Sequence, residues 1–594
     1  MAGRETNGAT RRGTLAGGLA LAGLVATTSV RAAASARGAL DALIADSARA
    51  EKGDPARFID PLSTAWAEAR RAARTAEQAR LKAIDRDALD PVGRLAHDVF
   101  AYRLAEDLDE FDSGRSEIAR LTPLDPSFGP QVEFPDAASG AGARFVTVQD
   151  YENGLTRLGD FAAYLGNVIV CLKQGLARGY VQPRIVVQNV LAEVDVMLAL
   201  APRDTPFFKP VLAMPGAIGP ADRARFTGAY EAAIASAVLP GYRLWKQYLT
   251  ETYLPVAREA PGLWAMKDGP KVYAAALRRH TTTDMTAAEI HRLGRSEVAR
   301  IRRAMEAARA ATGFRGDLHA LFHHVRTDPT FYFTRPDDLL DRFRQIEARI
   351  WQGIPRLFNR RPRAPFEVRP LPSMGEARGT GYYNLGPPDG SSPGVLYFNM
   401  AMLGTRPIPT LETLTLHEGI PGHHFQGSLA QENTALPDIL RFGHGGFTAY
   451  VEGWGLYSES LGKALGMFTD PWQWFGHLDF EMLRAVRLVV DTGLHAEGWS
   501  RQAAIAYMTD NTSMAAHDIA VEIDRYIADP GQATAYKVGE LKLHALRDRA
   551  AARLGRRFNL RDFHDQVLMT GAMPLATLEA KIDGWIAAGG PAYG

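Results

Sequence analysis

The sequence predicts a mainly α-helical protein with a small β-sheet or hairpin. Three observations lead to this prediction. Apolar residues recur at helical spacing over most of the chain, strand-like segments are few, and neither a flexible linker nor a long repeat divides the chain. Although 594 residues would allow roughly three or four domains, we therefore expect one large helical fold.

The N-terminus has the pattern of an export signal. The adjacent Arg11 and Arg12 precede a weakly apolar run over residues 15–30, and small residues suited to cleavage follow it. The pattern resembles a twin-arginine signal, and the run is short for a stable membrane span, although an uncleaved anchor is the alternative. We expect residues 1–36 to be removed, which leaves residues 37–594 as one periplasmic or secreted domain without a membrane span.

Most predicted helices follow from amphipathic runs. The clearest start is the capping box Thr286–Glu289, after which apolar residues recur at helical spacing to about residue 311. Comparable runs predict helices over residues 150–178, 182–201, 220–250, 337–358, 408–430, 446–466, 472–496 and 514–554.

The predicted strands are short. Residues Phe366–Arg369 and Gly394–Asn399 are rich in β-branched and aromatic side chains. The segment between them, which includes residues 386–393 with their glycines and prolines, is predicted to be a loop, as is the acidic stretch of residues 122–146. The second strand ends shortly before a histidine-rich segment, so we expect the small sheet to lie beside that segment.

The composition excludes several classes of protein. Lys and Arg total 68 and Asp and Glu total 67, so the net charge is +1 and we expect no nucleic-acid partner. The one cysteine, Cys171, can form neither an intramolecular disulfide nor a cysteine-based zinc site, and it lies too far from the signal to carry a lipid anchor. Metal chemistry would come from the 15 histidines and from carboxylates. The oligomeric state is left open.

Residues 416–426 read Leu-His-Glu-Gly-Ile-Pro-Gly-His-His-Phe-Gln, which is an altered zinc motif. In the common His-Glu-x-x-His motif, two histidines one helical turn apart bind zinc and the glutamate faces the bound water. Here Pro421 occupies the position of the second histidine. In a regular helix His417 and His423 would lie about 9 Å apart along the axis, too far to share an ion.

The Pro-Gly pair between the histidines offers a way to shorten this distance. Pro421 cannot donate the helical hydrogen bond to the carbonyl of His417, and Gly422 relaxes the backbone. A local bulge could therefore bring His423 to the second ligand position. His424 is the alternative ligand, or a neighbour that binds substrate.

A metal site also needs a third protein ligand. The segment Tyr450–Glu459 follows the glycine-rich residues 443–446 and is predicted to be a second helix. Glu452 and Glu459 are seven residues apart and share one face of it. We prefer Glu452 as the ligand. The alternatives are that Glu459 binds, or that neither does and the acid caps a helix or pairs with an arginine.

Residues 416–426 and 450–457 resemble a bacterial family catalogued as a domain of unknown function. Its pattern is His-Glu-x-x-Pro-Gly-His with a downstream Glu-Gly-Trp. That family is similar to helical zinc peptidases of the gluzincin type, such as the oligopeptidases related to thimet oligopeptidase and angiotensin-converting enzyme. The resemblance is strongest over residues 370–550. It implies a gluzincin-like fold, with the metal site and catalytic core in that region.

The resemblance also implies a zinc-dependent hydrolase of peptide bonds. In this interpretation His417, His423 and Glu452 hold Zn²⁺. Glu418 is the general base that takes the proton of the attacking water. The substrate is a peptide; exopeptidase or endopeptidase action, or cleavage of unusual amides such as γ-glutamyl linkages, is not decided.

Further site residues are implied by similarity. Related peptidases stabilise the oxyanion with a His and a Tyr from downstream helices, and the candidates here are His495 and Tyr536, with Arg525 and Lys537 as charged neighbours. A strand beside the metal helix often pairs with substrate in zincins, although its side chains could equally be packing residues. The candidate substrate-binding residues are His424, Tyr383, Asn399 and Arg525, with Tyr382 and Arg378 as further possibilities.

Other interpretations remain at this point. Two histidines and a carboxylate also hold iron in non-haem oxygenases, but those proteins are usually β-barrels. The main alternative is a non-catalytic exported metal- or peptide-binding protein with a zincin-like fold. Loss of the glutamate after His417 would be its signature, yet Glu418 is present.

Overall fold

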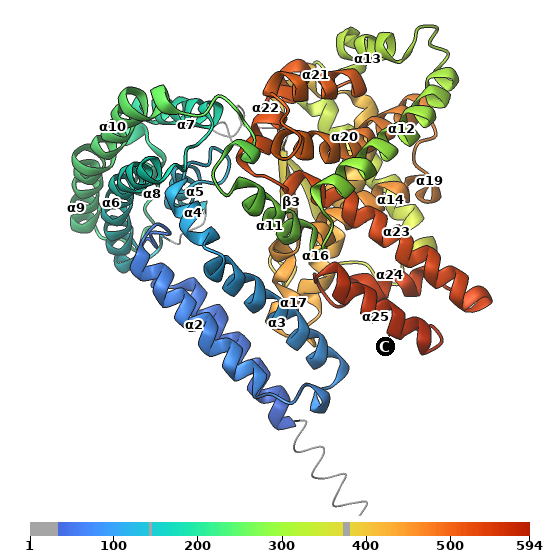
Figure 1. Cartoon of the computed structure of the whole chain (residues 1–594), viewed down its shortest axis with the longest axis horizontal. Coiled ribbons are helices and arrows are strands. Elements are labelled where there is room, and N and C mark those ends of the chain that lie inside the picture. Colours follow the sequence, from blue (N-terminus) through green and yellow to red (C-terminus); the bar gives the residue numbers. More distant parts are fainter. Residues whose placement is uncertain (1–33, 142–144, 372–380, 594) are drawn as a thin grey trace, which may run out of the picture.

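The computed structural model describes residues 34–141, 145–371 and 381–593, and it is mainly helical (Figure 1). The described strands form one sheet of three, so the predicted fold class is confirmed. Most of the predicted export signal, residues 1–33, lies outside the described residues, as does the candidate Arg378.

The described chain starts with a long helical hairpin. After a helix over residues 34–52, α2 (Thr64–Lys82) and α3 (Pro91–Asp112) pack side by side (Figure 1). The side chains of Ser63 and Asp90 accept hydrogen bonds from the first turns of α2 and α3 and so fix where each helix begins.

The next helices gather on one side of the molecule around a core of their own, which includes Phe161, Val190 and Trp245 (Figure 1). Residues 130–141 in this part were predicted to be loop but are helical, because Pro130 at the first position begins a short helix. The bounds are α4 (Arg115–Leu121), α5 (Pro130–Asp136), α6 (Val148–Arg178), α7 (Arg184–Leu198), α8 (Lys209–Leu212), α9 (Pro220–Ala233) and α10 (Leu239–Tyr248).

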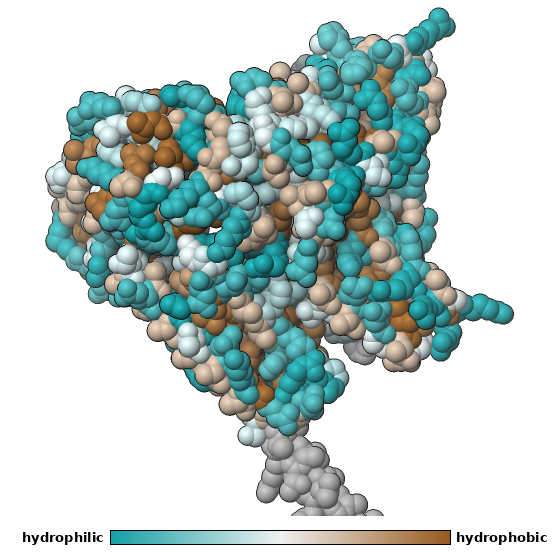
Figure 2. Space-filling model, in the orientation of Figure 1, coloured by the Kyte–Doolittle hydropathy of each residue, from teal (hydrophilic) through white to brown (hydrophobic). Residues whose placement is uncertain are grey.

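Helix α6 is long and apolar enough to cross a membrane by length and composition alone, and it is the one described helix that meets this condition. One of its faces is buried in the core through residues such as Leu158, Val168 and Leu172. A core helix of a globular protein passes the same test. The face shown in Figure 2 is mostly hydrophilic, with apolar residues dispersed among polar ones.

Two helices join this core to a second, larger one. Helices α12 and α20 pack along each other, and Gly294 allows close approach, since a β-carbon there would lie 2.6 Å from that of Leu488. Helix α12 begins at the predicted capping box of Thr286 and Glu289. The bounds are α11 (Gly269–Thr281), α12 (Ala287–Thr312), α13 (Leu318–Thr327), α14 (Pro336–Leu357) and α20 (Pro471–His495).

The sheet is small and mixed. The central strand β3 (Gly394–Phe398) pairs in parallel with β1 (Phe366–Pro370) and antiparallel with β2 (Gly381–Asn384). β1 and β3 agree with the predicted strands, whereas β2 lies in the segment predicted to be loop. Tyr382 and Tyr383 supply its strand character, and Tyr382 faces Tyr397 across the pair.

Among the C-terminal helices, α21 and α22 pack in the first core, whereas α23, α24 and α25 pack in the larger one. One predicted helix, residues 514–554, is two helices, because the chain turns at Gly531 with φ of 86° and the amide of Gly531 donates to the carboxylate of Asp491. The bounds are α15 (Leu411–Leu414), α16 (His423–Glu432), α17 (Asp438–Arg441), α18 (Thr448–Ser460), α19 (Gly462–Leu465), α21 (Arg501–Asn511), α22 (Ala516–Ala528), α23 (Ala535–Leu554), α24 (Leu560–Leu568) and α25 (Leu575–Ala587).

Candidate metal centre

The histidine motif lies where the predicted helix over residues 408–430 is broken. α15 runs into a π-helical turn, Thr415–Gly419, and α16 begins only at His423. A β-carbon at Gly422 would lie 1.8 Å from the carbonyl oxygen of His417, so the chain folds back here in a way that only glycine permits. This bulge replaces the regular helix that would have separated the two histidines.

Three donor atoms meet at the bulge. Oε2 of Glu452, on α18, lies 3.3 Å from Nε2 of His417 and 3.2 Å from Nε2 of His423. The two imidazole centroids are 4.6 Å apart, with the rings nearly perpendicular at 79°. The structure thus brings together the three residues that the sequence proposes as metal ligands.

The geometry of these atoms fits a tetrahedral metal ion. Bonds of 2.0–2.1 Å in a tetrahedral zinc site place neighbouring ligand atoms about 3.3 Å from each other. The Oε2 atom of Glu452 is buried and makes no hydrogen bond, although two ring nitrogens lie close to it. This arrangement is typical of ligand atoms that surround a common metal centre and do not form hydrogen bonds with one another. Two imidazoles and a carboxylate are also a donor set that zinc prefers.

Glu459 orients the first histidine. Its Oε1 lies 2.8 Å from Nδ1 of His417, and its side chain is 1% exposed. A carboxylate on Nδ1 fixes the ring so that Nε2 faces the centre, which is the usual second contact of a metal-binding histidine. Glu452 and Glu459 therefore have different positions: one at the donor cluster, the other behind the ring.

Helix α18 also supports the bulge directly. Nε1 of Trp454 donates to the carbonyl oxygen of Pro421 at 2.8 Å, and the hydroxyl of Ser458 donates to that of Leu416 at 2.8 Å. A β-carbon at Gly455 would lie 2.7 Å from Cε1 of His417. The Glu-Gly-Trp-Gly sequence thus supplies a donor atom, the space for an imidazole and an anchor for the Pro-Gly turn.

The electrostatics of the cluster favour a cation. Burial alone would lower the pKa of His417, but contacts with the carboxylates of Glu452 and Glu459 outweigh it and raise the pKa to about 9. Burial would raise the pKa of Glu452, but the two histidines hold it well below its usual value. The cluster is therefore a site of negative potential that positive charge stabilises.

The donor cluster opens into a large cavity of about 1190 Å³. Glu418 lines it, and a carboxylate oxygen of Glu418 lies within 4.8 Å of donor nitrogens of both His417 and His423. Opposite walls come from distant parts of the chain, including Asn189 on α7 and Tyr383 on β2. A small molecule or an extended peptide in this cavity would meet the cluster and Glu418 together.

Tyr536 and Arg525 also line the cavity, as proposed from sequence. Burial raises the pKa of Tyr536, and the negative charge of Glu452 raises it further, which shows that the phenol is electrostatically close to the donor cluster. Arg525 pairs with Glu522 at 3.0 Å and donates to Gln532 at 2.8 Å, so it has partners within the protein.

Two of the proposed histidines lie elsewhere. His495 is 1% exposed, accepts a hydrogen bond from the amide of Leu263 at 3.2 Å and has Nε2 2.9 Å from the carbonyl oxygen of Tyr526. His424 lies under the sheet, with Nδ1 2.8 Å from the hydroxyl of Tyr383 and Nε2 3.0 Å from a carbonyl oxygen. Burial lowers the pKa of each to about 4. Both imidazoles have hydrogen-bonding partners in the core, so the structure favours packing roles over the proposed ones.

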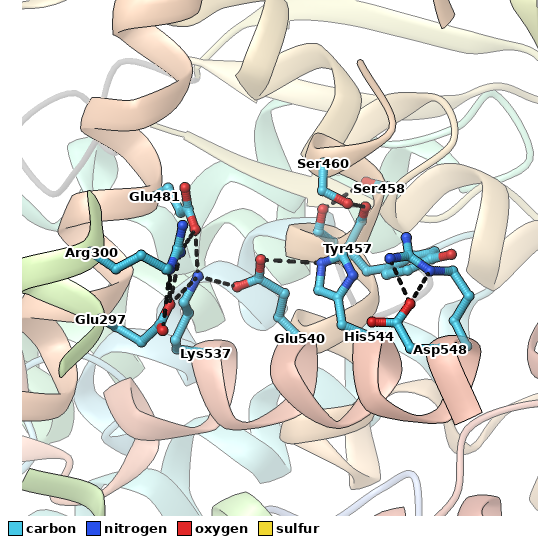
Figure 3. Close-up of polar contacts among 12 residues, drawn as sticks. Glu297, Arg300, Tyr457, Ser458, Ser460, Glu481, Lys537, Glu540, His544 and Asp548 are labelled. Atoms are coloured by element: carbon cyan, nitrogen blue, oxygen red, sulfur yellow. Dashed lines mark hydrogen bonds and ion pairs between the residues drawn. The ribbon is translucent and has the colours of Figure 1, made fainter. Parts of the chain in front are cut away.

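Asn399 and Lys537 are likewise turned into the protein. Asn399 is fully buried beside β3 and accepts a hydrogen bond from the amide of Ala401 at 3.1 Å. Figure 3 shows Lys537 pointing into a network of carboxylates, with its Nζ 2.8 Å from Glu481 and 2.7 Å from Glu540. Neither side chain lines the cavity. The sequence could not distinguish these buried polar groups from ligand-binding ones.

Sequence reasoning missed two arginines of the cavity wall. Arg484 and Arg487 lie one turn apart on α20 and line the cavity, although their side chains are only 7% exposed. The available signal was a pair of charges within an otherwise apolar stretch of helix, Met482–Val490. Charged side chains are rarely buried unless they have a partner or a function.

The fold and the site define a large helical protein whose His-His-Glu cluster faces a cavity. The chain belongs to the family described as "Bacterial protein of unknown function (DUF885)", which matches residues 48–582. No curated protein matches the sequence.

The solved structures similar to this chain include two described as lipoproteins. A protein from Colwellia psychrerythraea described as a "putative lipoprotein" has 28% identity and a TM-score of 0.78, covering 87% of this chain and 90% of its own. A "putative lipoprotein of unknown function" from Shewanella oneidensis has 18% identity and a TM-score of 0.70, covering 91% of this chain and 98% of its own. At that identity the second likeness concerns the fold alone.

Proposed function

We propose that the protein is a zinc-dependent peptidase of the zincin type. The observation that carries the proposal is the convergence of His417, His423 and Glu452 on a common centre, with Glu418 beside it at the wall of a large cavity. Histidine, glutamate, histidine and a second-helix glutamate are the parts of a gluzincin site, and the Pro-Gly bulge accounts for the unusual spacing.

Each residue has a chemical role in this proposal. His417, His423 and Glu452 would hold the ion, which when bound polarises the substrate carbonyl and acidifies water. Glu418 accepts the proton of the attacking water and later delivers it to the leaving amine. The hydroxyl of Tyr536 donates a hydrogen bond to the oxyanion, and burial keeps this phenol protonated.

The cavity favours a peptide substrate. Its volume of about 1190 Å³ exceeds that of a site for one small ligand. The exposed ring of Tyr382 and the half-buried ring of Tyr383 lie along one wall on β2, which is an edge strand of the sheet. An extended peptide would run past these rings to the donor cluster, where one of its amides meets Glu418.

We further propose that the protein acts outside the cytoplasm. The twin-arginine pattern of Arg11 and Arg12 supports export. The description of the similar structure from Colwellia psychrerythraea as a lipoprotein agrees with an exported family, although Cys171 is not placed to carry a lipid here.

Metal analysis combined with a peptide-library digest tests the proposal. We expect one zinc per chain and amide cleavage by the wild type, and retention of zinc with loss of cleavage in Glu418→Gln. Zinc without cleavage would instead support a non-catalytic metal- or peptide-binding protein. Full activity of Glu418→Gln would show that another group is the general base.

A further inference from the structure

The cavity wall contains a buried arginine that has no hydrogen-bonding partner. The guanidinium of Arg484 makes no hydrogen bond to any described residue, although its side chain is 93% buried and lines the cavity. The nearest carboxylate oxygen, Oε1 of Glu459, is 4.0 Å away and is already 2.8 Å from His417. The other favourable contact is with the ring of Phe480, 4.6 Å from the guanidinium carbon.

This arrangement is costly for the folded protein. A buried charge without a close counter-ion loses hydration that nothing replaces, so buried arginines are normally paired. Arg74, 5% exposed and remote from the cavity, illustrates the usual case, since it pairs with Glu77 at 2.6 Å and with Asp107 at 2.8 Å. The lack of a close counter-ion for Arg484 is therefore explained if an anionic ligand binds beside it.

A second arginine lies beside it. Arg487, one helical turn further along α20, pairs with Glu522 at 2.8 Å, but its Nη1 is buried without a hydrogen bond. Arg525 shares the same Glu522 at 3.0 Å. The wall thus has three guanidinium groups but only the carboxylate of Glu522 to pair with them, because Glu459 already contacts His417. This wall carries an excess of positive charge.

The arginine wall adjoins the donor cluster. Nη2 of Arg484 lies 4.0 Å from Oε1 of Glu459, the same oxygen that lies 2.8 Å from Nδ1 of His417. The guanidinium carbon of Arg487 lies 4.5 Å from the ring centre of Tyr536. An anion held here would lie next to the amide that Glu418 and Tyr536 act on. Guanidinium groups bind carboxylates through two parallel hydrogen bonds, which makes a carboxylate the best match.

We infer that Arg484, assisted by Arg487, binds a carboxylate of the substrate close to the scissile amide. The inference rests on the proposed peptidase function and narrows it to peptides with a free carboxylate near the cleaved bond. Such a carboxylate belongs either to the C-terminus of the peptide or to an acidic side chain. The two sources share the same recognition chemistry.

Three quenched fluorescent peptides distinguish these cases. Two share one sequence and have a free C-terminus or a C-terminal amide. The third is amidated and differs from them only by a glutamate next to the cleaved bond. Each is assayed with the zinc-loaded wild type and with Arg484→Met. We expect the wild type to prefer a peptide that has a carboxylate. In Arg484→Met, KM for that peptide should rise by about 30-fold or more, while kcat changes much less. Which peptide is preferred identifies the source.

The outcomes separate the two proposals. Equal KM values for all three peptides, unchanged in Arg484→Met, would overturn the carboxylate site and leave the peptidase function intact. Failure of the wild type to cleave any of these peptides or a peptide library would overturn the function and this inference with it.

Thermal unfolding of the ligand-free variants adds a readout independent of activity. Because Arg484 is an unpaired buried charge, Arg484→Met should unfold at the wild-type temperature or above it. The matched variant Arg74→Met leaves the carboxylate of Glu77 unpaired and removes one of the two arginine partners of Asp107, so it should unfold at a lower temperature. A loss of stability in Arg484→Met as large as that in Arg74→Met would indicate a structural role and contradict the inference.

Discussion

Two glutamates on one helix face show what single residues contribute to this site. The sequence placed Glu452 and Glu459 on a common face of a helix and could not decide between them. In the structure Oε2 of Glu452 reaches both imidazoles, whereas Glu459 stops behind His417. The two residues lie about 10.5 Å apart along the helix axis, so the difference comes from the position of α18 along its axis relative to the histidines, which a periodic pattern alone does not give.

Glu459 offers a test of this division of roles. In Glu459→Gln the amide can still accept a hydrogen bond from Nδ1 of His417 but no longer carries the charge that makes the ring a strong donor. We expect the affinity for zinc to fall by about 10- to 100-fold, as measured by competition with a chelating dye. The control is Glu432→Gln, at a buried acid on α16 that accepts hydrogen bonds from the amides of residues 363 and 364. Equal zinc affinity in both variants would contradict the assigned role.

Three candidate residues that do not line the cavity share one property. His424, His495 and Asn399 are polar side chains whose hydrogen bonds are satisfied by the core. The sequence alone cannot distinguish such a residue from one that points into a cavity, because each appears as a polar residue among apolar ones. Tyr536 and Arg525 were placed at the cavity by resemblance rather than by pattern.

At the scale of elements, the close packing of α18 against the broken helix decides the site. Gly455 leaves room for the ring of His417, and Gly453 lets the backbone of α23 approach, since a β-carbon there would lie 2.5 Å from the carbonyl carbon of Gly539. These glycines occur in a helix interior, where they would otherwise be unfavourable.

Replacement of Gly455 by alanine tests this element. Its β-carbon would lie 2.7 Å from the imidazole of His417, so either the ring or the helix must move. We expect Gly455→Ala to lose zinc and to unfold at a lower temperature. Gly159→Ala on α6, where a β-carbon meets no atom within 4 Å, should instead be neutral or stabilise by up to about 1 kcal/mol. Zinc content and melting temperature equal to the wild type in Gly455→Ala would refute this packing argument.

Element positions were easier to predict than element breaks. The capping box at Thr286 and the amphipathic runs located α12, α6, α14 and α20, since these depend on local spacing. A bulge was proposed from the sequence at Pro421-Gly422, whereas the break at Gly531 was not predicted, although Pro530 precedes this glycine. The turn at Gly531 depends on a distant carboxylate, Asp491, and β2 depends on pairing with β3. Local sequence carries little of that information.

At the scale of the whole molecule, buried histidines make stability depend on pH. Burial lowers the pKa of His424, His495 and His564 to about 4, against about 6.5 in an unfolded chain. As the pH falls from 6.5 to 4, the unfolded chain binds protons that the folded chain does not. We expect the free energy of unfolding to be highest above pH 6.5 and to fall on acidification, by on the order of 3 kcal/mol for each histidine.

Asp491 acts in the opposite direction and gives the control. Burial raises its pKa to about 7, so the folded chain binds this proton more tightly and acidification stabilises it through this group. Asp491→Asn removes that contribution. Melting temperatures of the two proteins over pH 4–8 should therefore fall more steeply towards acid in the variant. A shallower fall in the variant, or none in the wild type, would contradict these assignments.

The two cores meet along α12 and α20, and the cavity lies where walls from both cores face each other. The donor cluster belongs to the larger core, while α7, which also lines the cavity, packs in the smaller one. The cavity is therefore lined by residues from 126 to 536, which lie within the family match over residues 48–582.

The central claim is that His417, His423 and Glu452 hold a metal ion for amide hydrolysis. It is tested most directly by measuring zinc content and peptide hydrolysis side by side in the wild type, Glu452→Gln and Glu418→Gln. The account predicts zinc and hydrolysis in the wild type, loss of both in Glu452→Gln, and zinc without hydrolysis in Glu418→Gln. Undiminished zinc and hydrolysis in Glu452→Gln would contradict it.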